Sequence, residues 1–208
     1  MKPVVIGVTG GVGAGKSECL KYIERKYYCR VIYADPEAAK LRRKGEICYE
    51  PLVKLLGTEV LDPDGEIDPR KMAKRIYEEP ETRNAVNAIL HPAVNERIRT
   101  VIEEERKAGK LDFVFVEAAL LIENGYESIV DELWYIYADV SIRRKRLKES
   151  RGYTDERIDE ILAGQLSEEE YRAHCAVVID NGDEMIGTQK QIDRVLEGYI
   201  GGTKRTAE

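Results

Sequence analysis

Short runs of apolar, largely β-branched residues recur along the chain and predict buried strands. The first run is Val4 to Val8, and further runs cover residues 30–33, 113–116, 133–137 and 177–179. Uninterrupted apolar runs of this length are typical of strands that are buried on both faces, as in a parallel sheet. Because helical patterns separate the runs, the sequence predicts an α/β protein built as a three-layer parallel sheet.

Apolar residues at helical spacing fill the segments between these runs. A first helix is expected over residues 16–26, and a mainly helical block covers about residues 37–107. Proline and turn residues predict its internal boundaries, which are a turn at residues 62–65, helix starts at Pro69 and Pro80, and a break or kink at Pro92. Helical spacing returns in the arginine-rich segment 141–157, and a last amphipathic helix is expected over residues 185–199.

A glycine-rich loop joins the first expected strand to the first expected helix. Residues 10–17 satisfy the pattern G-x-x-x-x-G-K-[ST] and are called the phosphate loop below. Glycines allow backbone N–H groups to converge on phosphate oxygens, and the following helix directs its positive end at the same anion. We expect Lys16 to bridge the β- and γ-phosphates of ATP and the Ser17 hydroxyl to bind Mg²⁺. The expected nucleotide-binding residues are Gly11, Val12, Gly13, Ala14, Gly15, Lys16, Ser17 and Glu18.

Three polar residues follow strands of the expected sheet. Asp35 follows the second strand, Glu117 the third and Asn181 the fifth, so all three should face the edge where such folds bind ligands. Asp35 is either the acid-base group for an acceptor hydroxyl or the N-cap of a helix that begins at Pro36. Glu117 either contacts the acceptor or a Mg²⁺-bound water, or is a solvated carboxylate. Asn181 either shapes an adenine pocket or belongs to a turn.

Basic residues and one histidine are further candidates for the site. The cluster from Arg143 to Arg151 could neutralise charge on a transferring phosphoryl group, or could form a solvated helix face beside acidic neighbours. Within it, Arg146 and Arg151 are the catalytic candidates, together with Lys16 and Asp35. His91 is a candidate substrate-binding residue, with packing at a helix break as the alternative.

Composition narrows the classes of function. The net charge of -6 over 208 residues and a pI near 5.3 argue against a nucleic-acid partner bound by a broad basic surface. No apolar run approaches the roughly 18 residues of a membrane span, so a cytoplasmic protein without a membrane partner is expected. The guanine-binding pattern N-K-x-D is missing, which favours ATP. Four scattered cysteines without a C-x-x-C pair suggest reduced thiols rather than a zinc site.

Several segments together resemble the dephospho-coenzyme A kinase family. The phosphate loop and Tyr33-Ala34-Asp35 are followed, in the family's order and spacing, by matching segments at residues 67–70, 87–92, 120–125 and 178–181. The resemblance covers about residues 4–199. It implies MgATP-dependent phosphorylation of the ribose 3′-hydroxyl of dephospho-coenzyme A.

The same resemblance implies how the chain is divided. We expect one P-loop kinase domain over residues 1–199, with a helical coenzyme A-binding region at about residues 37–107. A lid is expected at about residues 143–165, called the lid segment below, and a flexible tail at residues 200–208.

Three positions depart from the family pattern. Tyr33 stands where the family often has an aspartate, which leaves Asp35 as a single carboxylate. Ala119 replaces a proline that usually precedes the Leu-Leu pair. In the lid segment, the arginine expected after Arg146 falls on Ser150, with Arg151 displaced by one residue. Another small-metabolite or nucleotide kinase, and a nucleotide-dependent switch, remain alternatives, and the oligomeric state is not fixed by the sequence.

Overall fold

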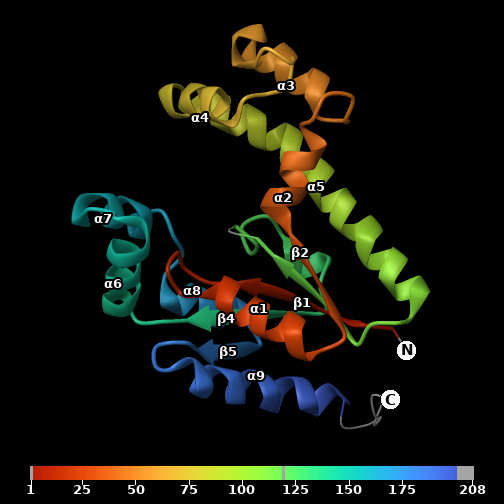
Figure 1. The fold of residues 1–208 in the computed structure, drawn as a ribbon, viewed down its shortest axis with the longest axis vertical. Helices are drawn as coiled ribbons and strands as arrows, with labels where there is room; N and C mark the ends of the chain where they lie inside the picture. The colour runs from red at the N-terminus through yellow and green to blue at the C-terminus, as the bar shows by residue number, and fades with distance from the viewer. Residues whose placement is uncertain (1, 119, 201–208) are drawn as a thin grey trace. The chain divides into compact units, whose positions relative to one another are not determined.

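The fold contains a five-stranded sheet with the order β2-β3-β1-β4-β5 (Figure 1). The computed structural model describes residues 2–118 and 120–200, so the expectations for Ala119 and for residues 201–208 of the tail lie outside it, whereas Ile200, also expected in the tail, ends the last helix. The strands are β1 (Val4–Thr9), β2 (Cys29–Tyr33), β3 (Phe113–Glu117), β4 (Glu132–Tyr137) and β5 (Val177–Asp180). Strand β1 pairs in parallel with β3 and β4, and β4 pairs in parallel with β5. Each predicted strand is confirmed and is one residue longer than expected.

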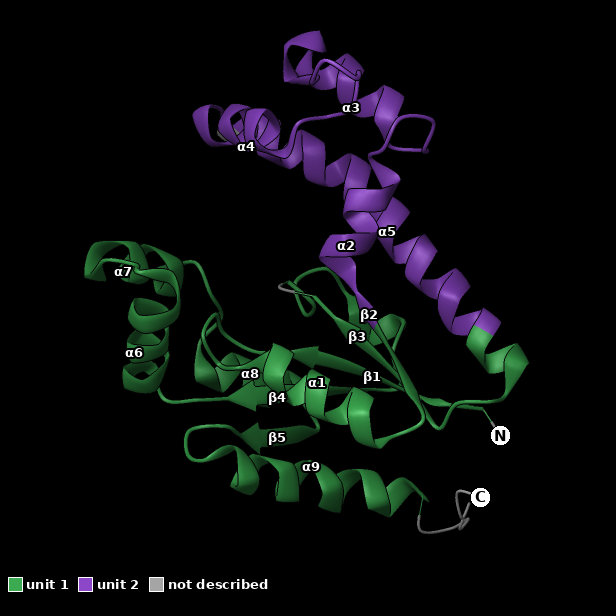
Figure 2. Ribbon diagram, in the orientation of Figure 1, with its two compact units in different colours: residues 1–31, 105–208 green, residues 32–104 purple. Residues whose placement is uncertain are grey.

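The chain forms two compact units, shown in different colours in Figure 2. Unit 1 consists of residues 1–31 and 105–208, and unit 2 consists of residues 32–104. The phosphate loop and the lid segment both belong to unit 1. Asp35 and His91 belong to unit 2.

Helices cover both faces of the sheet in unit 1. Its helices are α1 (Lys16–Lys26), η2 (Tyr126–Ser128), α6 (Val140–Arg151), α7 (Asp155–Ala163), α8 (Glu168–His174) and α9 (Met185–Ile200). On one face, Phe113 of β3 contacts Tyr27 at the end of α1 and Tyr199 of α9. On the other face, Tyr135 of β4 stacks on Tyr171 of α8, with 4.7 Å between the ring centroids. Aromatic side chains that alternate in direction along the strands therefore fix both helical layers.

Unit 2 is helical. It contains α2 (Ala34–Leu41), α3 (Tyr49–Leu56), η1 (Thr58–Val60), α4 (Pro69–Glu78) and most of α5 (Pro80–Ala108). The predicted starts at Pro69 and Pro80 are confirmed. At α4 the Asp68 carboxylate accepts hydrogen bonds from two first-turn N–H groups, which stabilises the start of that helix.

The structure corrects three helix predictions. Helix α2 begins at Ala34 rather than Pro36, since a proline fits anywhere in a first turn, where N–H groups have no intrahelical partner. Helix α5 continues through Pro92, where a break or kink was expected, so the break is excluded; the buried residues Leu90 and Val94 on either side hold the helix against the unit. Helix α8 was not predicted, because its seven residues are too few for a clear period.

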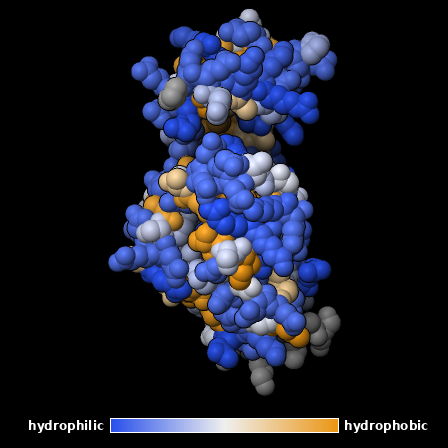
Figure 3. Space-filling model, turned by 90° about the vertical axis from the view of Figure 1, so that its left-hand side faces the viewer, coloured by the Kyte–Doolittle hydropathy of each residue, from blue (hydrophilic) through white to orange (hydrophobic). Residues whose placement is uncertain are grey.

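The core is apolar, and its largest fully buried side chains include Trp134, Phe113 and Phe115. Hydrophilic residues dominate the face shown in Figure 3, with apolar residues visible in patches between them. Within the described ranges, no helix is both long and apolar enough to cross a bilayer. Burial raises the pKa of the Cys19 thiol, which lies just after the phosphate loop, to about 12. This thiol is therefore protonated near neutral pH and is a packing residue rather than a nucleophile.

A single carboxylate joins helices α1 and α9. Asp193 of α9 accepts hydrogen bonds from the Tyr22 hydroxyl at 2.8 Å and the Tyr27 hydroxyl at 2.6 Å, and pairs with Lys26 at 2.7 Å. Burial alone would raise the pKa of Asp193, but these three donors outweigh it and lower the pKa. The ionised form of Asp193 is thus favoured in the folded state.

Replacing Asp193 should make the protein less stable in a pH-dependent way. We expect Asp193→Asn to reduce the free energy of unfolding at pH 7 by about 1–2 kcal/mol, since hydrogen bonds to a partly exposed charge are lost. A lowered folded pKa gives stability that is present above the unfolded pKa and disappears as the pH falls, so the difference should shrink below about pH 4. Urea denaturation at several pH values measures this. The control is Glu197→Gln, which changes an exposed acid one turn further along α9; equal effects of the two substitutions would contradict the prediction.

Candidate active site

The phosphate loop directs free N–H groups toward one side. Gly13 and Gly15 have positive φ angles of 84° and 91°, which side chains disfavour and which turn successive peptides. Gly15 precedes α1, and no side chain caps that helix. Among the described residues, the N–H groups of Gly13 and Gly15 have no acceptor. Together with the uncapped helix start, they form a group of donors suited to an anion.

Two loop carbonyls are bonded within the loop. The Lys16 ammonium donates to the Gly10 carbonyl at 2.7 Å, and the Ala14 N–H donates to the Gly11 carbonyl at 3.1 Å. The Lys16 ammonium also lies 3.9 Å from the carboxylate of Glu117 at the end of β3. The structure therefore brings Lys16 and Glu117 together, because strands β1 and β3 are neighbours in the sheet.

Side chains from outside the loop bind two further carbonyls. The Val12 carbonyl accepts from Arg143 Nε at 3.0 Å. The Ala14 carbonyl accepts from Asn181 Nδ2 at 2.7 Å and from Arg146 Nη1 at 3.3 Å. These donors lie in α6 and just after β5, so segments distant in sequence hold the backbone of the loop in place.

Asn181 is a fixed support of the loop rather than a surface turn residue. It is buried, and its Oδ1 accepts a hydrogen bond from the buried Thr188 hydroxyl at 3.0 Å. Its backbone carbonyl accepts from Arg146 Nη2 at 2.8 Å. A Cβ at Gly15 would overlap the Asn181 amide, so a glycine is required there for close approach as well as for its φ angle.

The two arginines predicted to be catalytic lie in different surroundings. Arg146 contacts the loop, whereas Arg151 ends α6 and lies over the ring of Tyr153, 5.9 Å from its centroid. Arg151 is five positions after Arg146 in the helix, which places the two arginines on different sides of α6. Ser150, one turn after Arg146, is on the Arg146 side and donates to its carbonyl at 2.6 Å. The one-residue displacement noted in the sequence thus corresponds to a change of helix face.

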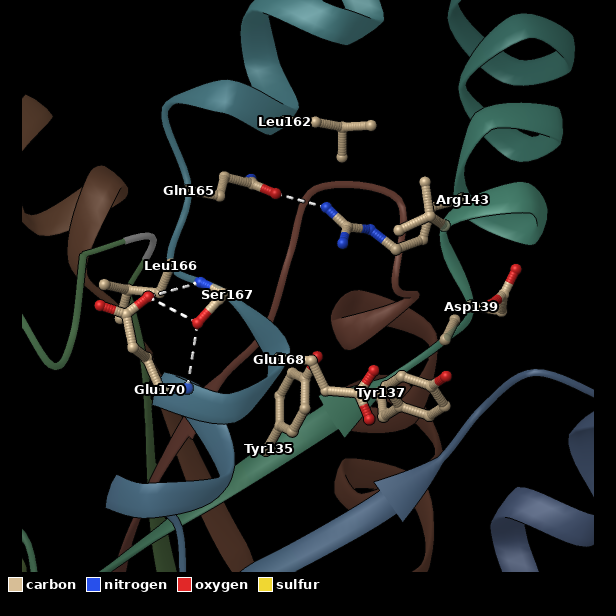
Figure 4. Close-up of a pocket in the computed structure, with 12 residues that line it drawn as sticks. Tyr135, Tyr137, Asp139, Arg143, Leu162, Gln165, Leu166, Ser167, Glu168 and Glu170 are labelled. Carbon is tan, nitrogen blue, oxygen red and sulfur yellow. Dashed lines mark hydrogen bonds between the residues drawn. The ribbon is translucent and has the colours of Figure 1, made fainter.

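Gln165 contacts the phosphate loop, although no sequence motif indicates this contact. It lies between α7 and α8, and its Oε1 accepts from the Val12 N–H at 3.3 Å and from Arg143. Arg143, Gln165, Tyr135 and Tyr137 line a cavity of about 400 Å³ at the end of β4 (Figure 4). Arg143 had been one of several arginines in a cluster, and only the folded chain distinguishes it from its neighbours.

The residues present suit a Mg²⁺ ion with a single hydroxyl ligand from the protein rather than one bound by several protein side chains. Ser17 is exposed in the first turn of α1, and Glu18 beside it pairs with Lys21 at 2.7 Å. The described part of the chain has no group of three or more acidic, histidine or cysteine side chains arranged to hold a metal. Mg²⁺ commonly takes one or two protein oxygens, with phosphate oxygens and waters completing the octahedron. The Ser17 hydroxyl fits that role.

Asp35 and His91 are placed in unit 2. Asp35 is exposed in the first turn of α2, where the helix N-cap is Tyr33 and no side chain makes a capping bond. The interpretation of Asp35 as an N-cap is therefore wrong. His91 is half-buried inside α5. Near Asp35 in sequence, the buried Glu37 accepts from Lys40 at 2.6 Å and from Arg97 at 3.4 Å.

Arg146 and Arg151 offer a matched test of these contacts. Arg146→Ala removes charge-assisted hydrogen bonds from the Ala14 and Asn181 carbonyls, so we expect ATP to bind about tenfold more weakly or worse. Arg151→Ala makes the same change in charge away from the loop and should alter the dissociation constant less than about twofold. Isothermal titration calorimetry measures both constants. Equal losses in the two variants would show that only the overall charge of the lid segment matters.

Comparisons with known proteins agree with this arrangement. The family model for dephospho-CoA kinase matches residues 4–186. The dephospho-CoA kinase of Symbiobacterium thermophilum is 30% identical over 198 residues, which cover 95% of this chain and 82% of that protein. A solved protein of Thermus thermophilus is 28% identical with a TM-score of 0.77, covering 95% of this chain and 98% of its own. A solved dephospho-CoA kinase of Campylobacter jejuni, 21% identical over 96% of this chain and 98% of its own, shares the fold with a TM-score of 0.71. The chain therefore has the fold of a P-loop kinase and belongs to the dephospho-CoA kinase family.

Proposed function

We propose that the protein transfers the γ-phosphoryl group of ATP to the ribose 3′-hydroxyl of dephospho-coenzyme A, giving coenzyme A and ADP. Membership of the kinase family supports the reaction class and the substrate. The observation that carries the proposal is the arrangement of the phosphate loop. Among the described residues, the N–H groups of Gly13 and Gly15 have no acceptor, while the carbonyls of Val12 and Ala14 accept hydrogen bonds from side chains outside the loop. Such a loop is suited to a polyphosphate chain.

Loop residues stabilise the charge that develops on the transferred group. Lys16 is only 13% exposed and lies between the Gly10 carbonyl and Glu117, so its ammonium group is held where it can reach the β- and γ-phosphates. Within the nucleotide-binding stretch at residues 11–18, the N–H groups of Gly13 and Gly15 bind the phosphate oxygens, because those of Val12, Ala14 and Glu18 donate to protein oxygens. Mg²⁺ bound at Ser17 would supply further neutralisation of the phosphate charge. Fixed donors of this kind need little reorganisation during the reaction.

Arg146 binds the nucleotide from the lid segment in this proposal. Its guanidinium lies beside the loop carbonyl of Ala14, and we expect it to transfer to a phosphate oxygen when the lid segment closes. Arg151 takes part only if the lid segment rearranges. Asn181 acts through the loop, whose Ala14 carbonyl it holds.

The acceptor hydroxyl needs a group to take its proton. As the ribose oxygen bonds to the γ-phosphorus, the bond to the β,γ-bridging oxygen breaks and the hydroxyl proton must leave. We assign that proton to Asp35, an exposed carboxylate with no capping role. Glu117 is the alternative base or a group that contacts the acceptor. The helical unit that contains His91 supplies the coenzyme A-binding region at about residues 37–107.

A cytoplasmic location and the absence of a membrane partner remain predictions. The absence of a nucleic-acid partner is also a prediction, which the net charge of -6 supports. The lid segment at residues 143–165, which contains most of α6 and all of α7, is proposed to close over the nucleotide.

The reaction is tested by measuring ADP release with a panel of acceptors. We expect fast turnover with dephospho-coenzyme A and little with nucleoside monophosphates, shikimate or water, because an acceptor completes the site only when it fits. The product should carry one added phosphoryl group on the ribose 3′-oxygen, as shown by mass spectrometry and ³¹P NMR. Preference for a monophosphate or shikimate would indicate another metabolite kinase. ATP hydrolysis that is indifferent to every acceptor would indicate a switch.

Asp35→Asn tests the assignment of the acceptor's proton. We expect kcat with dephospho-coenzyme A to fall by about 10² to 10⁴, the usual contribution of a positioned acid-base group, with the lower end favoured by a loose transition state. Affinity for ATP should be nearly unchanged, and so should the melting temperature, because Asp35 makes no capping bond. Single-turnover phosphorylation at saturating substrates gives the rate. Asp64→Asn, an exposed residue of the same unit, is the control. If Asp35→Asn keeps at least half of the wild-type rate, the proton goes to Glu117 or to solvent.

A further inference from the structure

The peptide groups of Val12 are held on both sides by one pair of side chains. Arg143 Nε donates to the Val12 carbonyl at 3.0 Å, and Gln165 Oε1 accepts from the Val12 N–H at 3.3 Å. Arg143 also donates to the same Gln165 oxygen, which closes the network (Figure 4). The pair therefore fixes the direction of the loop before Gly13, where the free N–H groups begin.

The Arg143 guanidinium is a buried positive charge in contact with the loop. Arg143 is 8% exposed, and a Cβ at Gly11 would overlap its guanidinium group. Burial lowers the pKa of Arg143, but an arginine remains protonated at neutral pH. A full charge is therefore kept out of water directly beside the phosphate loop.

No carboxylate in the described ranges forms an ion pair with this charge. The acids that line the same cavity are bonded to other groups. Asp139 accepts from the Ser141 N–H, Glu170 accepts from Ser167 and Glu168 pairs with Arg172 at 2.8 Å. A buried charge without a counter-charge is costly, and neutral acceptors such as the Val12 carbonyl and Gln165 compensate for it only in part. An anion bound at the loop would complete the compensation.

We infer that Arg143 and Gln165 are positioning residues, which hold the Val12 peptide groups and keep an unneutralised positive charge behind the loop for a polyphosphate to neutralise. Neither residue needs to touch the substrate. Gln165 contributes by being neutral, because it accepts hydrogen bonds from both Arg143 and Val12 without cancelling the charge. The inference rests on the proposed function only in taking the loop as the polyphosphate site.

This account predicts opposite effects of one isosteric substitution on stability and on binding. Gln165→Glu keeps an oxygen that accepts from Arg143 and Val12, but it places a carboxylate beside the guanidinium. We expect the melting temperature of the free protein to rise, because the buried charge becomes paired. We expect the dissociation constant for ATP to increase about tenfold, because the positive charge is already neutralised before the nucleotide binds.

Calorimetry with ATP and with inorganic tripolyphosphate separates this role from catalysis. Tripolyphosphate has neither a base nor a sugar, so its binding reports on the loop whether or not dephospho-coenzyme A is the acceptor. If no acceptor in the panel is phosphorylated but Gln165→Glu still weakens tripolyphosphate binding, the proposed reaction is wrong and the inference about Arg143 and Gln165 holds. Gln189→Glu adds the same charge on α9 and should change both affinities less than about twofold.

Two outcomes would overturn the inference. If Gln165→Glu is as stable as the wild type or more so, yet binds both ligands within about twofold of it, the charge of Arg143 does not serve the anion. Gln165→Leu removes the shared acceptor and should also weaken tripolyphosphate binding by about tenfold. If Gln165→Leu melts cooperatively and binds normally, the pair does not position the loop. If the leucine variant fails to fold, the isosteric variant decides.

Discussion

One constraint underlies the structure. The carbonyl groups of the phosphate loop that point away from the anion need hydrogen-bond donors from the rest of the protein. A loop that turns its N–H groups toward one point turns its carbonyls the other way, and buried carbonyls need donors. Here the Gly10 carbonyl is bonded by Lys16, the Val12 carbonyl by Arg143 and the Ala14 carbonyl by Asn181. Arg143 and Asn181 therefore shape the anion site without needing to touch the anion, whereas Lys16 also binds it in the proposed reaction.

The sheet order explains why these donors are available. Strand β1 lies between β3 and β4, and β5 follows β4, so the carboxyl ends of four strands adjoin the loop. Glu117 comes from the end of β3, Arg143 from the helix after β4 and Asn181 from the end of β5. Aromatic contacts such as Tyr135 on Tyr171 hold the strands and helices that carry them. Packing far from the loop thus determines which side chains reach it. The proposed reaction rests on that arrangement together with the family of the chain.

Local signals in the sequence predicted much of this, and nonlocal contacts account for the rest. Buried strands of a parallel sheet are marked by their own apolar residues, so all five were found, and the phosphate loop was marked by its glycines. The start of α2 was placed two residues late, and the helix break considered at Pro92 does not occur, because packing of the neighbouring buried residues outweighs the local preference of proline. Gln165 lies 153 residues from Val12, and no sequence pattern relates the two. Helix α8 could have been predicted from the capping box formed by Ser167 and Glu170. It was missed because the helix is too short to show a clear apolar period.

A crystal structure with a non-hydrolysable ATP analogue tests the central claim most directly. The account predicts that the N–H groups of Gly13 and Gly15 donate to phosphate oxygens, while the Val12 carbonyl keeps its bond from Arg143 and the Ala14 carbonyl its bond from Asn181. The donor atoms should then be shifted only slightly, as expected of a preformed site. A loop that rebuilds on binding, with the Val12 or Ala14 carbonyl released from Arg143 or Asn181, would contradict the claim that these side chains preform the anion site.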